Sequence, residues 1–289
     1  FFLYFFLTGL IFILFTFSGI RLFNSFNLAM TISSTGAFLP TNELSNLIRS
    51  PVQSMILTCG LTFSALNIYF FYSLFTNLNI LKKHYEDIAI LLVAFFFSLI
   101  LFFSIGKISF LNIFTNVVSS LSNSGLSSYS PPNNFYLFFI FLTILGGSVI
   151  SNSSGIKFIR LYILFKSSVL EIFKLVSPNI VLDQNILKTE HKINNENINL
   201  SFLIFICFFI SIFLLSSMLS AGGINFENSF KLSILTITNT VNSSLYGLEE
   251  IDFSNLLTSS KLFLIFFMVL GKIELLSFFL IIKKVIRRN

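Results

Sequence analysis

The stretch NVVSSLSNSGLSSYSPP at residues 116–132 places hydroxyls, amides and a glycine between two strongly apolar runs. The run before it, ILLVAFFFSLILFFSIG at 90–106, and a later one, LSFLIFICFFISIFLLSSML at 200–219, are continuously apolar. Strands of a membrane β-barrel would instead alternate apolar and polar residues over about ten positions. The sequence therefore predicts an all-α transmembrane protein in which the polar stretch lies at membrane depth.

Composition agrees with a chain that crosses the membrane several times. The 289 residues are 55% hydrophobic and 10% charged, with a mean hydropathy of +0.89, which exceeds the apolar content of ordinary soluble domains. Cys59 and Cys207 each lie inside an apolar run and are expected to pack as free thiols, without a disulfide or a metal site. The chain opens with Phe1 in mid-span, which indicates a piece of a longer protein with no signal peptide.

The net charge of +6 is explained by membrane orientation. Lysine and arginine gather at 82–84, 166–192 and 283–289, whereas the segment 126–135 holds no charge and 248–253 is acidic. By the positive-inside rule the basic segments are cytoplasmic and the other two are external. No nucleic-acid partner is expected, and membrane lipid is the surface that the chain should contact.

A threefold repeat organises the chain: an apolar span, a short amphipathic half-helix, a filter-like loop of small residues, and a second span. The three copies occupy 1–18, 22–33, 33–38 and 51–75; 85–106, 109–121, 122–127 and 134–166; and 199–220, 227–240, 241–247 and 259–286. These copies divide the chain into pore repeats at 1–80, 81–170 and 199–289, with a cytoplasmic linker at 171–198. The units are expected to surround a central ion pathway.

The half-helices are too short to cross about 30 Å of hydrocarbon at about 1.5 Å per residue, so each should enter from outside and turn back. Irregular backbone at that depth requires protein or water around it, and backbone carbonyls there can replace the hydration shell of a cation. The predicted filter residues, with Gly36, Gly125 and Ser244 as equivalents, are Ser34, Thr35, Gly36, Asn123, Ser124, Gly125, Asn242, Ser243 and Ser244. The alternative is that each polar stretch is a surface loop.

Two further features indicate a gate below the filter. The segment GGSVISNSSGIK at 146–157 interrupts an apolar span with small polar residues, and Lys272 lies near mid-membrane, where a charge is costly unless it faces water or a partner. Lys157 and Arg160 should mark the cytoplasmic exit. Close helix packing at the segment and a snorkelling Lys272 are the alternatives. The predicted gate residues are Gly146, Gly147, Ser151, Asn152, Ser153, Ser154, Gly155, Lys157 and Lys272.

Four stretches together resemble the Trk/Ktr/HKT superfamily of potassium and sodium transporters, in particular the bacterial Trk-type potassium-uptake subunit. They are AMTISSTGAF at 29–38, SSLSNSGL at 119–126, LGGSVISNSSGIKFIR at 145–160 and MVLGKIELLSFFLI at 268–281. The resemblance implies four units around one pore, of which this chain carries the second to fourth. It also implies potassium as the ion at the filter, no covalent cofactor, a homodimer in the bacterial plasma (inner) membrane, and a cytoplasmic nucleotide-binding regulatory subunit that contacts residues 166–199.

The sequence departs from the family pattern at two positions. Ser244 stands where the fourth filter glycine is usual, with Gly247 as an alternative register, and Lys272 replaces an arginine. A sodium-permeable or poorly selective transporter is therefore the first alternative, and a non-conducting scaffold subunit or a membrane-bound transferase is the second. An enzyme is not expected, because His84 and His191 lie in charged cytoplasmic segments and no Ser, His and acid grouping shares a membrane depth.

Overall fold

A computed structural model describes residues 2–36, 39, 44–76, 84–106, 108–177, 185–187, 192–240, 244–248, 253 and 256–273. Over these residues the chain is almost entirely helical, with one isolated β-bridge between Asn185 and Lys192. The helices are α1 (Phe2–Phe17), α2 (Leu22–Ser34), η1 (Leu44–Asn46), α3 (Pro51–Ala65), α4 (Ile68–Thr76), α6 (Tyr85–Ile105), α7 (Phe110–Leu121), η2 (Asn133–Phe135), α8 (Tyr136–Leu145), α9 (Phe158–Val176), α10 (Asn195–Ala221), α11 (Phe226–Ile237) and α12 (Thr258–Lys272).

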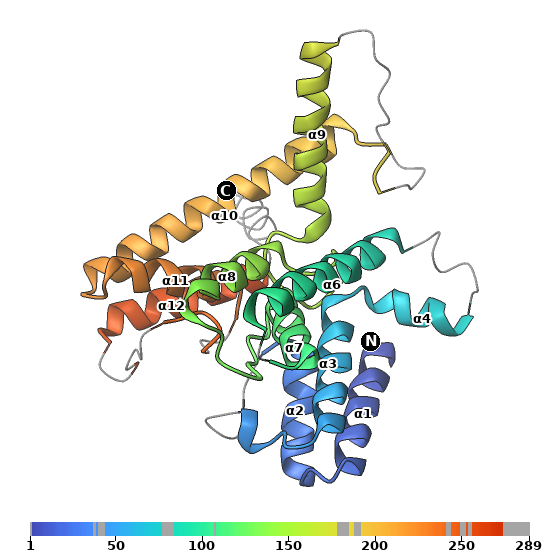
Figure 1. Ribbon diagram of the computed structural model, residues 1–289. Helices are drawn as coiled ribbons and strands as arrows, with labels where there is room; N and C mark the ends of the chain where they lie inside the picture. The colour runs from blue at the N-terminus through green and yellow to red at the C-terminus, as the bar shows by residue number, and fades with distance from the viewer. Residues whose placement is uncertain are drawn as a thin grey trace, which may run out of the picture.

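Consecutive helices pack in three groups, α1–α3, α6–α8 and α10–α12 (Figure 1). The groups are joined by contacts of α3 with α7 and of α8 with α11, whereas α9 contacts α10 and α6 and its far end projects away from the rest. In each group the middle helix begins and ends close to the predicted half-helix. The grouping follows the segment order of the predicted repeat, and the repeat itself stays a prediction.

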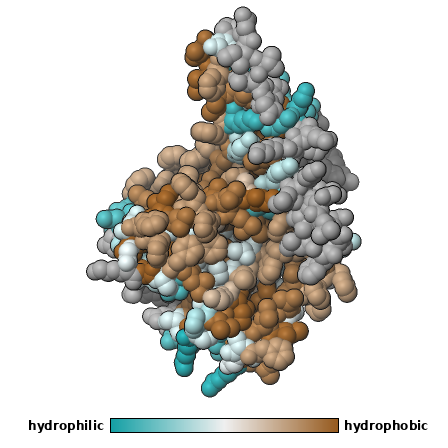
Figure 2. Space-filling view, turned by 45° about the vertical axis from the view of Figure 1, so that its right-hand side comes forward, coloured by the Kyte–Doolittle hydropathy of each residue, from teal (hydrophilic) through white to brown (hydrophobic). Residues whose placement is uncertain are grey.

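The outer surface is suited to lipid. Among the described helices, α6 and α10 are long and apolar enough to cross a bilayer by length and composition, and α1, α7 and α8 are shorter apolar helices. Brown apolar side chains cover much of the face in Figure 2. Phe103 on α6 is 80% exposed and Phe213 on α10 is 60% exposed. Apolar exposure on this scale is characteristic of a surface that contacts another apolar phase.

The start of α3 follows directly from its sequence. The Ser50 hydroxyl accepts a hydrogen bond from the backbone N–H of Gln53, and the Gln53 side chain returns a bond to the Ser50 N–H. Pro51 occupies the first turn, where its missing N–H costs no hydrogen bond. The Gln53 amide also donates to the Ser18 carbonyl at 3.0 Å and so ties α3 to the end of α1.

The predicted interruption at 146–157 is present between α8 and α9. Gly146 ends α8 with a φ of 65°, a left-handed conformation that glycine adopts at little cost. The chain then makes an irregular loop, and the N–H of Ile156 returns to the Ile144 carbonyl at 3.1 Å. Residues 146–157 are called the intramembrane loop below.

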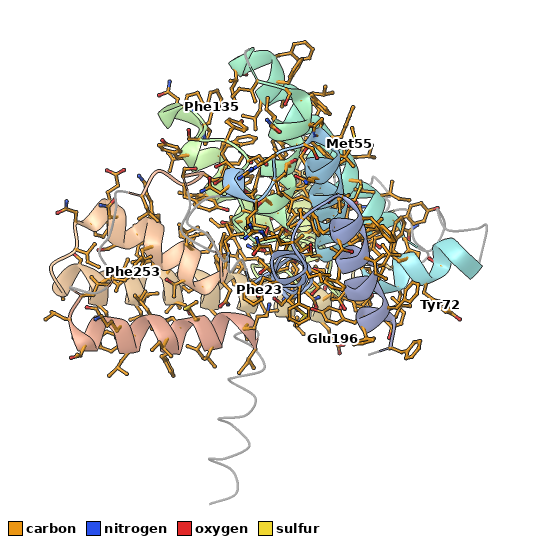
Figure 3. The ribbon with its side chains drawn as sticks, turned by 90° about the horizontal axis from the view of Figure 1, so that it is seen from below. Phe23, Met55, Tyr72, Phe135, Glu196 and Phe253 are labelled. Atoms are coloured by element: carbon orange, nitrogen blue, oxygen red, sulfur yellow. The ribbon has the colours of Figure 1, made fainter. Side chains whose placement is uncertain are left out.

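The predicted continuous span at 51–75 is wrong, because the structure divides it into α3 and α4. Asn67 stands at the break, where its N–H donates to the Asp87 carboxylate at 2.8 Å and its side-chain oxygen accepts from the Tyr69 N–H at 2.9 Å. These bonds replace the helical ones at this position. As a result α4, which carries Tyr72, extends away from the bundle (Figure 3). The last predicted span, 259–286, is described only through Ile273.

Candidate functional site

The three short helices α2, α7 and α11 end with the same local structure. Thr35, Asn123 and Asn239 follow these helices with φ angles of 54°, 60° and 52°. A positive φ is uncommon in residues other than glycine. Three such residues at corresponding positions therefore indicate one repeated turn. The N–H after each left-handed residue bonds back to a helix carbonyl, in the pairs Gly36–Thr31 (3.1 Å), Ser124–Ser119 (3.0 Å) and Thr240–Leu235 (2.8 Å).

This repeated turn gives a register that differs from the one expected from sequence. It aligns Gly36 with Ser124 and Thr240, whereas the sequence suggested Gly36, Gly125 and Ser244. Gly125 follows its helix end by one residue more, and Ser244 lies further along its loop. Asn242 and Ser243 lie outside the described residues. The three segments therefore leave their half-helices alike, and the predicted filter residues follow at different distances along the sequence.

The polar segment after α7 is buried inside the protein. Ser122, Asn123 and Ser124 are 0%, 1% and 0% exposed, so the surface-loop alternative does not describe this copy. The Asn123 amide donates to the Thr143 carbonyl of α8 at 2.8 Å and to the Thr240 hydroxyl after α11 at 3.4 Å. Asn123 thus brings the ends of α7 and α11 together.

Sequence reasoning missed the residue that holds the outer part of this loop. Asn116 on α7 is completely buried, and its amide donates to the Tyr129 carbonyl at 3.0 Å. Its side-chain oxygen accepts from the Ser128 N–H at 2.8 Å. Both ends of one amide are therefore used to fix the returning chain. Such a residue has no signal in a single sequence beyond being polar on an otherwise apolar helix.

A lysine on α11, which the sequence analysis also missed, holds the loop that follows this helix. Lys231 donates to the Gly247 carbonyl at 3.2 Å and pairs with Glu227 at 2.6 Å. Gly247 has a φ of 57°, and a Cβ there would lie 1.9 Å from the Tyr136 ring. The Gly247 carbonyl therefore already has a donor, while Ser244 is exposed.

The intramembrane loop and Lys272 meet at the end of α2. The Asn152 amide donates to the Ser33 carbonyl at 2.7 Å, and the Thr35 hydroxyl donates to the Asn152 carbonyl at 3.2 Å. The Lys272 ammonium donates to the Ser34 carbonyl (3.2 Å), the Thr35 hydroxyl (3.2 Å) and the Asn152 carbonyl (3.1 Å). Lys272 thus links α12, the end of α2 and the loop, and its contacts are not those of a snorkelling side chain.

The intramembrane loop is closed on itself. Lys157 is 3% exposed and its ammonium donates to the carbonyls of Ser151 and Ser153, so it fills the loop, and its place at the cytoplasmic exit stays a prediction. The Ser153 hydroxyl accepts from the Gly147 N–H at 2.9 Å. A Cβ at Gly147 would lie 2.2 Å from the Ala65 carbonyl of α3. Ser154 is also buried, and positive φ angles occur at Gly146 (65°), Gly155 (85°) and Lys157 (77°).

One grouping contradicts the sequence analysis. Ser73 on α4 lies 2.8 Å from Nε2 of His84, and Nδ1 of His84 lies 3.1 Å from the Asp87 carboxylate on α6. The expectation that no Ser, His and acid share a location is therefore wrong. It failed because the break at Asn67 brings Ser73 of α4 beside His84 at the start of α6, which the continuous-span prediction does not allow. His191 lies outside the described residues.

No family model matches the chain. It is 25% identical over 273 residues to the Trk system potassium uptake protein TrkG of Escherichia coli, covering 89% of this chain and 55% of TrkG. It is 25% identical over 241 residues to an uncharacterized cation transporter of Methanocaldococcus jannaschii, covering 79% of this chain and 48% of that protein. The chain thus spans about half the length of these curated relatives.

The fold matches a solved structure more completely. The crystal structure of the potassium transporter TrkH from Vibrio parahaemolyticus superposes with a TM-score of 0.82 at 19% identity. The match covers 95% of this chain and 61% of that one. The relatives are named as transporters and none is an enzyme, which agrees with the expected absence of enzymatic activity.

Proposed function

Because this chain belongs to the superfamily of Trk-type cation transporters, we propose that it forms part of a potassium-uptake pathway across a bacterial plasma membrane. The observation that carries the proposal is the shared left-handed turn at the ends of α2, α7 and α11, followed by loops that contain the predicted filter residues. TrkG, named a potassium uptake protein, supports potassium as the ion.

The half-helix ends supply the electrostatic part of the mechanism. The C-terminal end of a helix carries about half a negative charge on its unpaired carbonyls. Three such ends directed at one axis, with the loop carbonyls of Gly36, Gly125 and Ser244, would bind a dehydrated cation in place of its water shell. Asn123, which joins the ends of α7 and α11, supports this convergence.

The intramembrane loop and Lys272 form the proposed gate. Asn152 is bonded to the end of α2, so the loop occupies the position through which an ion leaving the filter would pass. The Lys272 ammonium adds a positive charge at the same point and repels cations. Opening requires the loop to release Ser33 and Thr35, which also frees the helix end to face the ion.

The assembly around this pathway is likewise proposed. The repeats at 1–80, 81–170 and 199–289 would each contribute one side of the pore, with 171–198 as a linker. The projecting α9 is consistent with contact to a cytoplasmic nucleotide-binding regulatory subunit through this region (Figure 1). The exposed apolar side chains of α6 and α10 would face lipid or the second copy of a homodimer.

Ion uptake by the full-length protein tests the function directly. In cells that lack their own potassium uptake, expression should restore growth at low potassium and accumulation of rubidium as a tracer. Growth that is restored only with sodium present, or sodium accumulation at an equal rate, would favour the poorly selective alternative. Membrane-inserted protein without uptake of either ion would favour a scaffold subunit.

A glycine at position 244 should make the filter more selective. Ser244 is exposed in a loop whose other fixed carbonyl, at Gly247, already binds Lys231. Ser244→Gly frees the backbone to match the other filter positions. The potassium-to-sodium permeability ratio should therefore rise, by about tenfold if the preference for potassium gains about 1.4 kcal/mol. An unchanged ratio would place the fourth filter position earlier, near Thr240.

A further inference from the structure

A cluster of polar side chains lies beside the intramembrane loop but outside the filter. It comprises Asn67, Ser73, His84, Glu86 and Asp87, which are called the α4–α6 clamp here. Asp87 is 1% exposed and Ser73 is 8% exposed, so the bonds that each makes to His84 are shielded from solvent. The clamp joins the α3–α4 break to the first turn of α6 through the bonds of Asp87 to Asn67 and His84.

The clamp is connected to the intramembrane loop at its first residues. A Glu86 carboxylate oxygen accepts from the Val149 N–H at 3.0 Å. The neighbouring Ser148 N–H donates to the Ala65 carbonyl at the end of α3, at 2.9 Å. The loop is therefore held between α3 and α6, which are the two elements that the clamp holds together through Asn67.

Three hydrogen bonds of the clamp, Ser73 to Phe70, His84 to Ser73 and His84 to Asp87, form together only when His84 and Asp87 share an additional proton. When the Ser73 hydroxyl donates to the Phe70 carbonyl, at 2.8 Å, it accepts from Nε2 of His84. The bond between Nδ1 and the Asp87 carboxylate needs a second proton, because an ionised carboxylate only accepts. The pair therefore holds two protons, whichever of the two partners carries the second.

Loss of that proton weakens the clamp in two ways. The Ser73 hydroxyl must turn from Phe70 to His84, so that one hydrogen bond is lost. The buried Asp87 carboxylate then keeps its hydrogen bonds from Asn67 and His84 but has no counter-charge in the pair, which is unfavourable for a buried ion. Among the described residues, the other groups that face the clamp are the Phe70 ring, 5.4 Å from the His84 ring, the Ser148 hydroxyl beside Asp87, and the cations of Lys157 and Arg160, which act on Glu86.

Ser73, His84 and Asp87 are connected in the order serine, histidine, acid, as in a hydrolase triad, but they do not form one. In such a triad the serine hydroxyl donates to the histidine, whereas Ser73 donates to a helix carbonyl and is buried. The grouping is better placed to bind a proton than to attack a substrate.

We propose that protons on the side of the membrane that carries His84 regulate the gate, because the doubly protonated His84–Asp87 pair holds α3 and α6 around the intramembrane loop. This inference rests on the proposed function and names a regulator of the same pathway. The sign follows from the proton count: the clamp is tight at low pH, where the pair holds its second proton, and loosens as pH rises and that proton is lost. Flux should therefore rise with pH on that side.

Flux measurements in proteoliposomes test the proposal, with the full-length protein and the pH changed on each side separately. Rubidium flux by the wild type should increase about threefold to tenfold between about pH 6 and pH 8 on the His84 side. His84→Gln keeps a donor and an acceptor but does not titrate, so its flux should change little with pH. Asp87→Asn should flatten the profile likewise, and Glu196→Gln, an exposed carboxylate on α10, should keep the wild-type profile.

The outcomes separate this proposal from the proposed function. Rubidium flux that does not depend on pH on the His84 side overturns the regulatory proposal and leaves the transport function intact, however the variants fold. An unchanged pH profile in inserted His84→Gln also overturns it. Absence of any monovalent-cation flux by the wild type overturns the transport function itself. The potassium-to-sodium ratio should remain constant across the pH series, because the clamp does not touch the filter.

Discussion

Lys272→Met should increase potassium flux by about tenfold or more while leaving ion selectivity unchanged. The Lys272 ammonium makes three hydrogen bonds, to the end of α2 and to the intramembrane loop. A hydrogen bond that involves a charged group contributes about 1.5–3 kcal/mol, and about 1.4 kcal/mol changes an equilibrium tenfold. Methionine keeps the length of the side chain without these bonds or the charge, so the blocking position of the loop should become less populated.

Lys272→Arg provides the matched control, because it keeps the positive charge and can donate to the same carbonyls. Its flux should remain close to that of the wild type. Flux is measured together with the amount of membrane-inserted protein, since a misfolded variant would lower both. Flux that falls in Lys272→Met at normal insertion would mean that Lys272 assists conduction, and would contradict its role in the gate.

The local fold could be predicted where a residue pattern acts over a few positions. The ends of α2 and α7 follow from amphipathic runs that stop at small polar residues, and the interruption at 146–157 follows from its glycines and serines. The division of α3 from α4 could not be predicted, because the sequence around Asn67 stays apolar and has neither Pro nor Gly. There a tertiary bond to Asp87 decides the structure.

The site was predictable in its residue types and less so in its register and contacts. Lys272 was placed at the gate because a mid-membrane charge needs a partner, but its partners at Ser34 and Asn152 depend on the folded loop. At the end of α11 the repeated turn aligns Thr240 with Gly36, whereas the sequence matches Ser244 to Gly36, so the filter register stays a prediction. Similarity between loop sequences does not show at which residue a helix ends.

Gly271→Ala should strongly destabilise the protein, although alanine normally favours a helix over glycine by about 0.5–1 kcal/mol. A Cβ at Gly271 would lie 1.9 Å from the Ile237 carbonyl at the end of α11, and this atom belongs to backbone that cannot rotate away. Asn239 also bonds to the Met268 carbonyl at 3.0 Å, so the two helices are fixed at this crossing. Overpacking of this kind costs about 1–3 kcal/mol.

Gly9→Ala makes the opposite test with the same substitution. Gly9 lies inside α1, and a Cβ there would meet nothing within 4 Å, so only the intrinsic preference for alanine remains. The thermal unfolding temperature in detergent should therefore fall for Gly271→Ala and stay level or rise for Gly9→Ala. Because Gly271 directly precedes Lys272, the inserted fraction of Gly271→Ala should also show raised flux per molecule, as α12 moves away from α11 and carries the ammonium from Asn152. Equal unfolding temperatures for the two variants would show that α12 does not cross α11 this closely.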